Sequence, residues 1–313
     1  MALQEKRWIF PPETLQSVYS ETETLEDLWK GDSAYLSHLG LNDITINNFI
    51  EYRNNLDFKK YKNLIKTINQ NSCKLIKYVD KEYPNRLRNL KGGAHLGSPL
   101  VLIHKGSVMN FDNNVAIVGT RECSHYGHMM ARQFARELAK KGYTIVSGLA
   151  RGIDTEAHCG ALEAKQGKTI AVLAWMRPIY PKENEQLAKD IEKNGALISE
   201  NYFKSQYGGG RLQRAMFVDR NRITSGISKC LIAIEAGSSS GTVHQVRLSL
   251  KQGRKVFALK PKPENKKANE GFNEFLKMGA TPISSLKPVL NFLASKSIGN
   301  KLEEKSLEEY IQN

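Results

Sequence analysis

The stretch "KKGYTIVSGLARGIDTEAHCGALEAKQGKTIAVLA", residues 140–174, carries the pattern that decides the fold. A Lys-Gly pair leads into the apolar run 143–146, a turn holds Arg151 between two glycines, and a helix-like segment ends at another glycine before the apolar run 169–173. Lysine suits the last turn of a helix, glycine suits the left-handed residue just past it, and a continuous apolar run suits a buried strand. The stretch therefore predicts a strand, a helix and a second strand.

The same alternation continues along the chain. Five times a helix-like stretch ending in lysine and glycine passes into an apolar run: 140–148, 165–174, 193–199, 251–259 and 277–283. The runs 115–119 and 230–237 predict two further strands, and Met130, Phe134 and Leu138 form a stripe on the helix 127–141 that can pack on a sheet. This alternation predicts an α/β fold, an extended Rossmann-like, doubly wound and mostly parallel sheet.

The domain organisation is predicted to have three parts. Residues 1–73 lack strand patterns and form a small helical N-terminal region. Residues 74–288 form the extended Rossmann-like domain, which opens with strand-like runs at 73–79 and 99–106. Residues 289–313 form a short helical tail without room for a further domain.

The composition favours an anionic partner. The chain has 46 Lys and Arg against 32 Asp and Glu, a formal net charge of +14, which suits a polyanion because neutralising phosphates releases counterions. No apolar run is long enough to span a membrane and no signal segment opens the sequence, so we expect a cytoplasmic protein without a membrane partner. The four cysteines lack CxxC spacing, and we expect no metal and no cofactor.

The first of four candidate ligand segments is 118–127, at a predicted strand end. In a doubly wound sheet, ligands bind where the carboxyl ends of strands meet helix N-termini. Gly119 allows close backbone approach, while Thr120, Arg121 and Ser124 offer donors to a phosphate. The segment lacks the GxGxxG pattern of dinucleotide sites, and a tight turn with a solvated arginine is the alternative.

The second segment, 147–158, follows the next strand. Ser147 and Gly148 end that strand, Arg151 and Gly152 form the turn, and Asp154 is the expected N-cap of the following helix. An arginine placed beside a helix N-terminus and another anion site is costly unless an anion arrives. We therefore expect Arg151 to bind a phosphate.

The third segment, 217–228, has an aromatic residue followed by two arginines. Arg220 and Arg222 flank Asn221, and their planar guanidinium groups can form paired hydrogen bonds with phosphates. Phe217 can stack on a base, or it can lie in the core.

The fourth segment is the small-residue loop 238–242. Ser240, Gly241 and Thr242 offer hydroxyl and backbone donors for an anion, although the loop can equally be a tight connection with a capping hydroxyl. All four segments are predicted to be strand-end loops that meet at one edge of the sheet, which fits an extended anionic ligand better than one small phosphate.

Several quoted segments resemble those of the DNA-processing protein A family, also called DprA or Smf. They are "VAIVGTRECSHYG", "GYTIVSGLARGIDTEAHCGAL", "TIAVLA", "IYPKENEQLAKDIEKNGALISE", "FVDRNRITSGIS" and "IEAGSSSG", with "YPNRLRNL" preceding them. The resemblance implies a dimer that binds single-stranded DNA and hands it to a RecA-type recombinase during natural transformation. It implies DNA-binding roles for Gly119, Thr120, Arg121, Ser147, Arg151, Phe217, Arg220, Asn221 and Arg222.

The sequence departs from the family pattern at several positions. Val218 stands where the family has proline, "SGTVHQV" replaces its usual SGSLxTA, "LKP" replaces its VPG, and the winged-helix domain common in the family has no room after residue 288. These departures leave phage defence, or pairing with a toxin, open as an alternative to transformation and handover to a recombinase.

The rival reading is a nucleotide-cleaving enzyme related to phosphoribohydrolases. Such an enzyme needs a carboxylate to stabilise positive charge at the ribose, and His244 and Gln245 stand where it would be. We therefore predict a protein that is not an enzyme and has no catalytic residues. Binding of a small nucleotide by the same pocket stays open.

Overall fold

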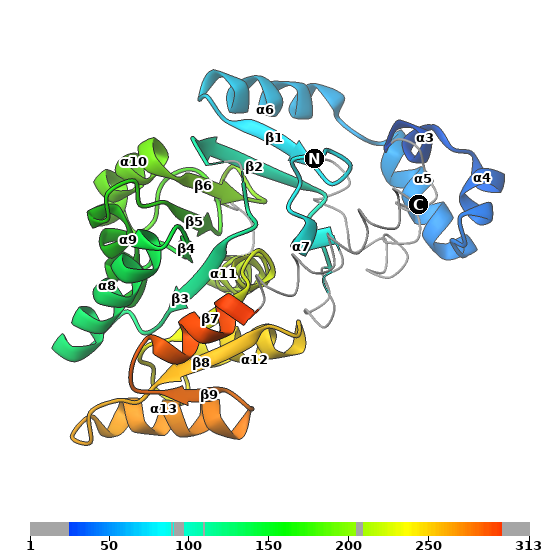
Figure 1. Ribbon diagram of the computed structural model, residues 1–313. Coiled ribbons are helices and arrows are strands. Elements are labelled where there is room, and N and C mark those ends of the chain that lie inside the picture. Colours follow the sequence, from blue (N-terminus) through cyan, green and yellow to red (C-terminus); the bar gives the residue numbers. More distant parts are fainter. Residues whose placement is uncertain (1–24, 89, 91–96, 109, 205–208, 296–313) are drawn as a thin grey trace, which may run out of the picture.

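The computed structural model describes residues 25–88, 90, 97–108, 110–204 and 209–295. Within them one nine-stranded sheet runs in the order β1-β2-β6-β5-β4-β3-β7-β8-β9 (Figure 1). The strands are β1 (Lys74–Lys77), β2 (Val101–Gly106), β3 (Asn114–Val118), β4 (Thr144–Ser147), β5 (Thr169–Leu173), β6 (Ala196–Ser199), β7 (Cys230–Ala233), β8 (Lys255–Leu259) and β9 (Thr281–Ile283). From β6 to β9 all neighbours are parallel, whereas β2 is antiparallel to both β1 and β6.

Helices cover both faces of the sheet because alternate strand residues point to opposite sides. In β3, Val115 and Ile117 pack with the helices α8 and α9, whereas Ala116 and Val118 pack with α12 and α13. The helices are α3 (Leu25–Lys30), α4 (Ser33–His38), α5 (Asp43–Asn54), α6 (Phe58–Gln70), α7 (Asn85–Arg88), α8 (His125–Lys140), α9 (Ile153–Glu163), α10 (Glu185–Asn194), α11 (Gly209–Gly226), α12 (Gly241–Lys251) and α13 (Lys266–Lys277). The predicted doubly wound α/β fold is confirmed.

All nine predicted strands are present, but the glycine rule holds only in part. Gly142, Gly253 and Gly279 have positive φ after a helix, as expected. At the β5 junction Gln166 takes the left-handed conformation instead of Gly167. Gly195 has an extended φ of −162°, and it is glycine because an added Cβ would lie 1.8 Å from the Thr169 carbonyl oxygen.

The N-terminal helices lie beside one edge of the sheet. In Figure 1, α3, α4 and α5 form a group to the right of the sheet, and α6 runs along β1. Leu28, Leu36 and Phe49 are fully buried in a core that they share with Leu100 and Val101 at the start of β2. Residues 1–24 and 296–313 lie outside the described residues, and within the described ones no helix has the length and apolarity needed to cross a membrane.

The segment 217–228 differs from its prediction as a strand-end loop. Residues 217–226 form the second half of α11, an 18-residue helix that precedes β7. Ile223 and Ile227 bury against β4, β5 and β6, which holds this helix across the sheet. Its functional side chains therefore reach the carboxyl edge from a helix surface and not from a loop.

The strand order creates a crevice beside β3. The chain adds β4, β5 and β6 on one side of β3 and then crosses over to β7 on the other side. Ligands of doubly wound sheets bind outside the carboxyl ends of the strands at such a reversal. The loops after β3, β4 and β7 meet at this place.

Candidate nucleic-acid interface

The β3–α8 loop, residues 119–124, carries Arg121 on a fixed backbone. The Thr120 amide donates to the Glu235 carbonyl oxygen at 2.7 Å. The Ser124 hydroxyl donates to the Glu235 carboxylate at 2.8 Å and accepts from the Gly127 amide at 3.1 Å, as the N-cap of α8. The Arg121 side chain is exposed above this anchored loop.

The β4–α9 loop packs directly on the β3–α8 loop. Gly152 has a φ of 71°, and a Cβ there would lie 2.5 Å from the Thr120 carbonyl oxygen. The Ile153 amide donates to the same oxygen at 3.2 Å. Only glycine can meet both demands, which explains why Gly152 follows Arg151 in the sequence.

The structure corrects the expected N-cap of α9. Gly152 occupies the N-cap position, and Asp154 lies inside the helix. The Asp154 carboxylate accepts from the Gly148 amide at 3.1 Å and from the Ala150 amide at 3.4 Å, so it stabilises the turn before the helix. Burial raises the pKa of Asp154, and the nearby Arg220 opposes that shift.

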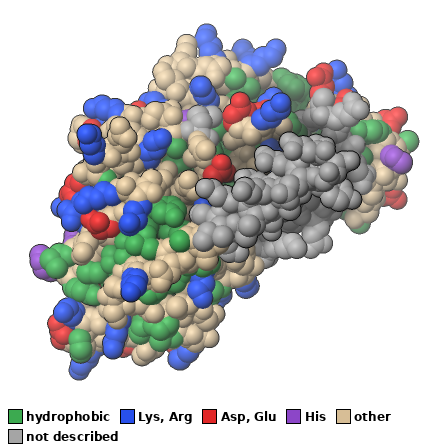
Figure 2. All heavy atoms as spheres, viewed as in Figure 1, with side chains coloured by type: hydrophobic (Ala, Val, Ile, Leu, Met, Phe, Trp, Pro, Cys, Tyr) green, Lys and Arg blue, Asp and Glu red, His purple; other side chains and the backbone are tan. Residues whose placement is uncertain are grey.

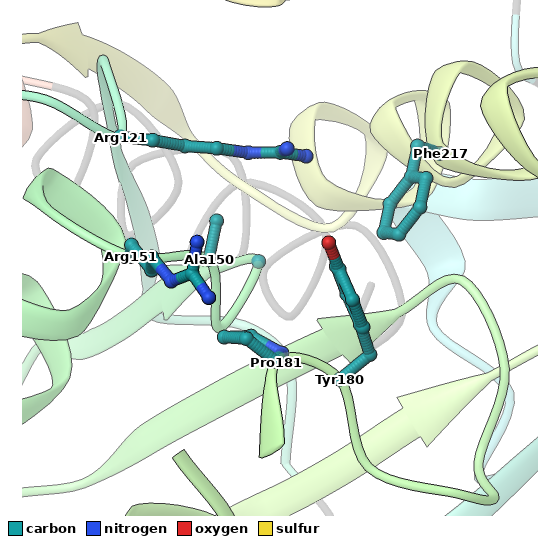
Figure 3. A pocket seen from close by; sticks show the side chains of 7 residues that line it. Arg121, Ala150, Arg151, Tyr180, Pro181 and Phe217 are labelled. Atoms are coloured by element: carbon teal, nitrogen blue, oxygen red, sulfur yellow. The ribbon is translucent and has the colours of Figure 1, made fainter. Parts of the chain in front are cut away.

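Arg121, Arg151 and Phe217 line one small pocket with Tyr180 and Pro181 (Figure 3). The Arg121 guanidinium carbon lies 5.7 Å from the centre of the Phe217 ring. The picture shows Arg121 extending toward α11 and the Tyr180 hydroxyl pointing into the space between them. The structure thus brings together two loop arginines and one helix aromatic that the sequence placed in different segments.

Phe217 belongs to an aromatic cluster that the sequence analysis missed. Its ring centre lies 5.1 Å from that of Trp175 and 5.7 Å from that of Tyr180. Trp175 is buried, whereas Tyr180 is 47% exposed. The signal that could have found them is the aromatic and proline-rich stretch "WMRPIYP", 175–181, directly after a predicted strand.

Arg151 carries an acidic partner that the sequence analysis also missed. Its Nε donates to the carboxylate of Glu183, in the short 3-10 helix Lys182–Asn184, and both side chains are exposed. This one hydrogen bond lowers the pKa of Glu183 and raises the pKa of Arg151. A ligand phosphate must compete with this carboxylate.

A larger groove of about 450 Å³ adjoins the small pocket and reaches the β7–α12 loop. Its lining includes the predicted residues Gly119, Thr120, Arg121, Phe217, Arg220, Asn221, Ser240, Gly241 and Thr242. Three lining atoms are buried without a hydrogen-bond partner in the described structure: Arg220 Nε, Thr224 Oγ1 and Ser240 Oγ. Unsatisfied buried donors are costly, so a groove that contains three of them is suited to a polar ligand.

Arg220 lies deep in this groove. Its Nη1 donates to the Val172 carbonyl oxygen at 2.8 Å, and a side chain at Gly148 would overlap its guanidinium. Burial lowers the pKa of Arg220, and Asp154 partly offsets the effect. Gly148 therefore leaves the space that the Arg220 guanidinium occupies.

Two predicted site residues, Arg222 and Ser147, are placed away from the groove. Arg222 is 1% exposed and donates to both oxygens of the Glu200 carboxylate, at 2.6 and 2.5 Å, and from Nε to the Gly97 carbonyl oxygen at 2.8 Å. Ser147 is fully buried, and its hydroxyl donates to the Ile117 carbonyl oxygen at 2.7 Å inside the sheet. Both predictions are corrected, because these polar groups are already bonded within the protein.

Comparison with known proteins decides the family. The family model described as DNA recombination-mediator protein A matches residues 74–294. The chain belongs to this family. The resemblance seen in the motifs is thereby confirmed, and the family description names a recombination mediator.

Curated relatives and solved structures extend this result. Protein Smf of Synechocystis is 30% identical over 95% of this chain and 72% of its own length, and the DNA processing protein DprA of Bacillus subtilis is 34% identical over 64% of this chain and 65% of its own. The X-ray structure of DprA from Streptococcus pneumoniae covers 92% of this chain and 95% of its own with a TM-score of 0.70 and 26% identity. A DprA structure from Helicobacter pylori, whose study concerns its single-stranded DNA binding mode, covers 72% of this chain and 96% of its own with a TM-score of 0.59 and 28% identity.

Proposed function

We propose that this family member binds single-stranded DNA along the carboxyl edge of its sheet. The observation that carries the proposal is the convergence of Arg121, Arg151 and Phe217 on one opening, next to a groove with unsatisfied polar atoms. Guanidinium groups bind phosphates through charge-assisted hydrogen bonds, and an aromatic ring beside them can stack on a base.

The geometry favours an unpaired strand over a duplex. Phe217 and Tyr180 line the small pocket, and their rings contact each other. A base must therefore unstack from a DNA duplex to reach them. Single-strand binders combine such stacking rings with a positive groove that follows the backbone. Figure 2 shows Lys and Arg side chains spread over much of one face of the molecule, in keeping with the net charge of +14.

The β7–α12 loop supplies the other end of the proposed path. Ser240 is the N-cap of α12, yet its hydroxyl makes no capping bond, and Gly241 is exposed with open space around it. Backbone amides at such a helix start point toward the groove and favour an anion. We place one phosphate here and others near Arg121 and Arg151.

The biological setting in this proposal is recombination. The protein acts in the cytoplasm as a homodimer that hands its strand to a RecA-type recombinase during DNA uptake. The family description, DNA recombination-mediator protein A, supports recombination, and the name DNA processing protein of two curated relatives supports a role in handling DNA. Phage defence, alone or with a toxin partner, is the alternative setting, and addition of a recombinase to the DNA complex distinguishes the two.

The decisive experiment is a titration of labelled oligo(dT) followed by fluorescence anisotropy at several salt concentrations. We expect binding that weakens steeply with salt, weaker binding to a duplex of equal length, and loss of binding in the Arg121→Ala/Arg151→Ala double variant with an unchanged thermal melt. Equal binding by this variant and the wild type would remove the proposed site.

A small nucleotide is the second candidate ligand, and the groove volume and its unsatisfied atoms favour it. Gln245 lines the groove as a neutral amide, with its Nε2 donating to the Asn221 carbonyl oxygen at 2.9 Å. A mononucleotide site would show a weak salt dependence, in contrast to a strand path. Release of base from nucleoside monophosphates would instead establish the enzyme.

A further inference from the structure

A cluster of lysines follows β8, beyond the groove already described. The segment 260–270 spans the β8–α13 loop and the start of α13 and contains two glutamates, Glu264 and Glu270. No acidic side chain of the described residues lies within ion-pair distance of its lysines. Four exposed lysines make up the cluster: Lys260, Lys262, Lys266 and Lys267.

Two of these lysines are held against neighbouring elements. The Lys262 ammonium lies 5.1 Å from the centre of the Tyr126 ring, in the first turn of α8. The Lys267 stem lies over Gly237, where an added Cβ would come within 3.0 Å of Lys267 Cε. A cation held on an aromatic face or along a turn loses less freedom on binding an anion than one trailing in water.

The lysine segment is joined to the proposed DNA site by Glu235. The Asn265 side chain donates to the Glu235 carboxylate at 2.5 Å, and the same carboxylate accepts from Ser124 at the end of the Arg121 loop. Because β8 runs parallel to β3 and lies two strands away, the two loops emerge on the same edge, about 10 Å apart.

We propose that the lysine segment 260–267 is a second phosphate-binding segment for the same DNA strand. The strand would leave the groove at Ser240 and Gly241, pass Gly237 and cross the β8–α13 loop. The inference rests on the proposed function and extends its path by one strand position, from β7 to β8. Lysine ammonium groups contact phosphates as point charges, so this segment adds affinity and length dependence without base preference.

A purely solvated lysine face is the simpler explanation for such a cluster. It accounts for exposure, but it does not account for the contacts of Lys262 with Tyr126 and of Lys267 with Gly237. It also predicts that the lysines act equally on all anions through net charge alone. The phosphate-binding segment predicts an effect that depends on oligonucleotide length.

The test compares Lys262→Gln/Lys267→Gln with a charge-matched control, Lys141→Gln/Lys168→Gln, whose exposed lysines precede β4 and β5 at the opposite edge. Labelled oligo(dT) from about 4 to about 20 nucleotides is titrated at several salt concentrations. For long oligonucleotides we expect the first variant to reduce the magnitude of the slope of log K against log [salt] by about 0.7 for each lysine. At 0.1 M salt this corresponds to about a fivefold loss of affinity for each lysine. The shortest oligonucleotides should bind it as they bind the wild type.

Any other result overturns either this inference or the proposed function on which it rests. An equal response of both variants at every length would show that only net charge matters and would overturn the inference. A loss of equal size on short and long oligonucleotides would also overturn it, because the lysines would then belong to the central site. A wild-type protein that binds no oligonucleotide would overturn the proposed function itself, and Arg121→Ala should weaken short and long ones alike.

Discussion

Arg121 and Arg151, on two strand-end loops, have environments that differ from those of Arg220 and Arg222, on α11. Arg121 and Arg151 are exposed at the mouth of a pocket, whereas Arg222 is sealed against Glu200 and Arg220 is bonded to the Val172 carbonyl. On a helix, residues two positions apart point to nearly opposite sides, so Arg220 and Arg222 cannot both face one groove. In the proposed function the loop arginines therefore bind the ligand, whereas Arg222 stabilises the position of the helix through Glu200.

The largest expected effect concerns the sealed arginine. Arg222→Ala leaves the Glu200 carboxylate buried without a partner, which should lower the free energy of unfolding by about 3–5 kcal/mol in urea titrations. The double variant Arg222→Met/Glu200→Leu removes both charges and should recover much of that loss. A stable Arg222→Ala protein that binds oligo(dT) poorly would contradict the division between loop and helix arginines.

The exposed arginine should show the reverse behaviour. Arg121→Ala should weaken oligo(dT) binding by about 1–3 kcal/mol, since it removes a charge-assisted contact, and leave urea unfolding unchanged. Arg247→Ala, an exposed arginine on α12 that does not line the groove, is the control. Similar binding losses in both variants would mean that net charge alone attracts DNA.

Phe217 contacts both the pocket that Arg121 and Arg151 line and the buried Trp175, so it can serve ligand binding or the core. Phe217→Leu keeps an apolar contact with Trp175 but removes the stacking face, so we expect about 1 kcal/mol weaker oligo(dT) binding with little change in stability. If the Leu variant binds as the wild type does and melts at a lower temperature, the ring serves the core.

The smallest effect is expected at Glu183, which pairs with Arg151. Glu183→Gln removes a competing carboxylate and should raise oligo(dT) affinity by no more than about fivefold, because exposed ion pairs are weak. Glu185→Gln, an exposed acid in the first turn of α10 without an ion pair among the described residues, provides the comparison. An equal gain in oligo(dT) affinity in both variants would show that the net charge of the protein, and not the pairing with Arg151, is responsible.

The sequence was sufficient to predict the sheet and the meeting of Arg121 and Arg151 at one pocket. Lysine and glycine before five of the nine apolar runs mark helix ends and buried strands, and the carboxyl edge of a doubly wound sheet then brings Arg121 and Arg151 together. It was not sufficient for α11, because an arginine-rich stretch beside glycine looks like a loop when its partners are unknown. Glu200 lies 22 residues from Arg222, and Glu183 lies 32 residues from Arg151. No local sequence pattern predicts pairs so far apart in the chain.

The contact of Gly152 and Ile153 with the Thr120 carbonyl has a mechanical consequence. It joins the backbones that carry Arg121 and Arg151 through main-chain atoms. The distance between the two Cα atoms is therefore set by the sheet and does not depend on the side chains. Replacing either arginine by lysine would change one phosphate contact and leave that distance unchanged. A methyl group added at position 152 would instead push the two loop backbones apart.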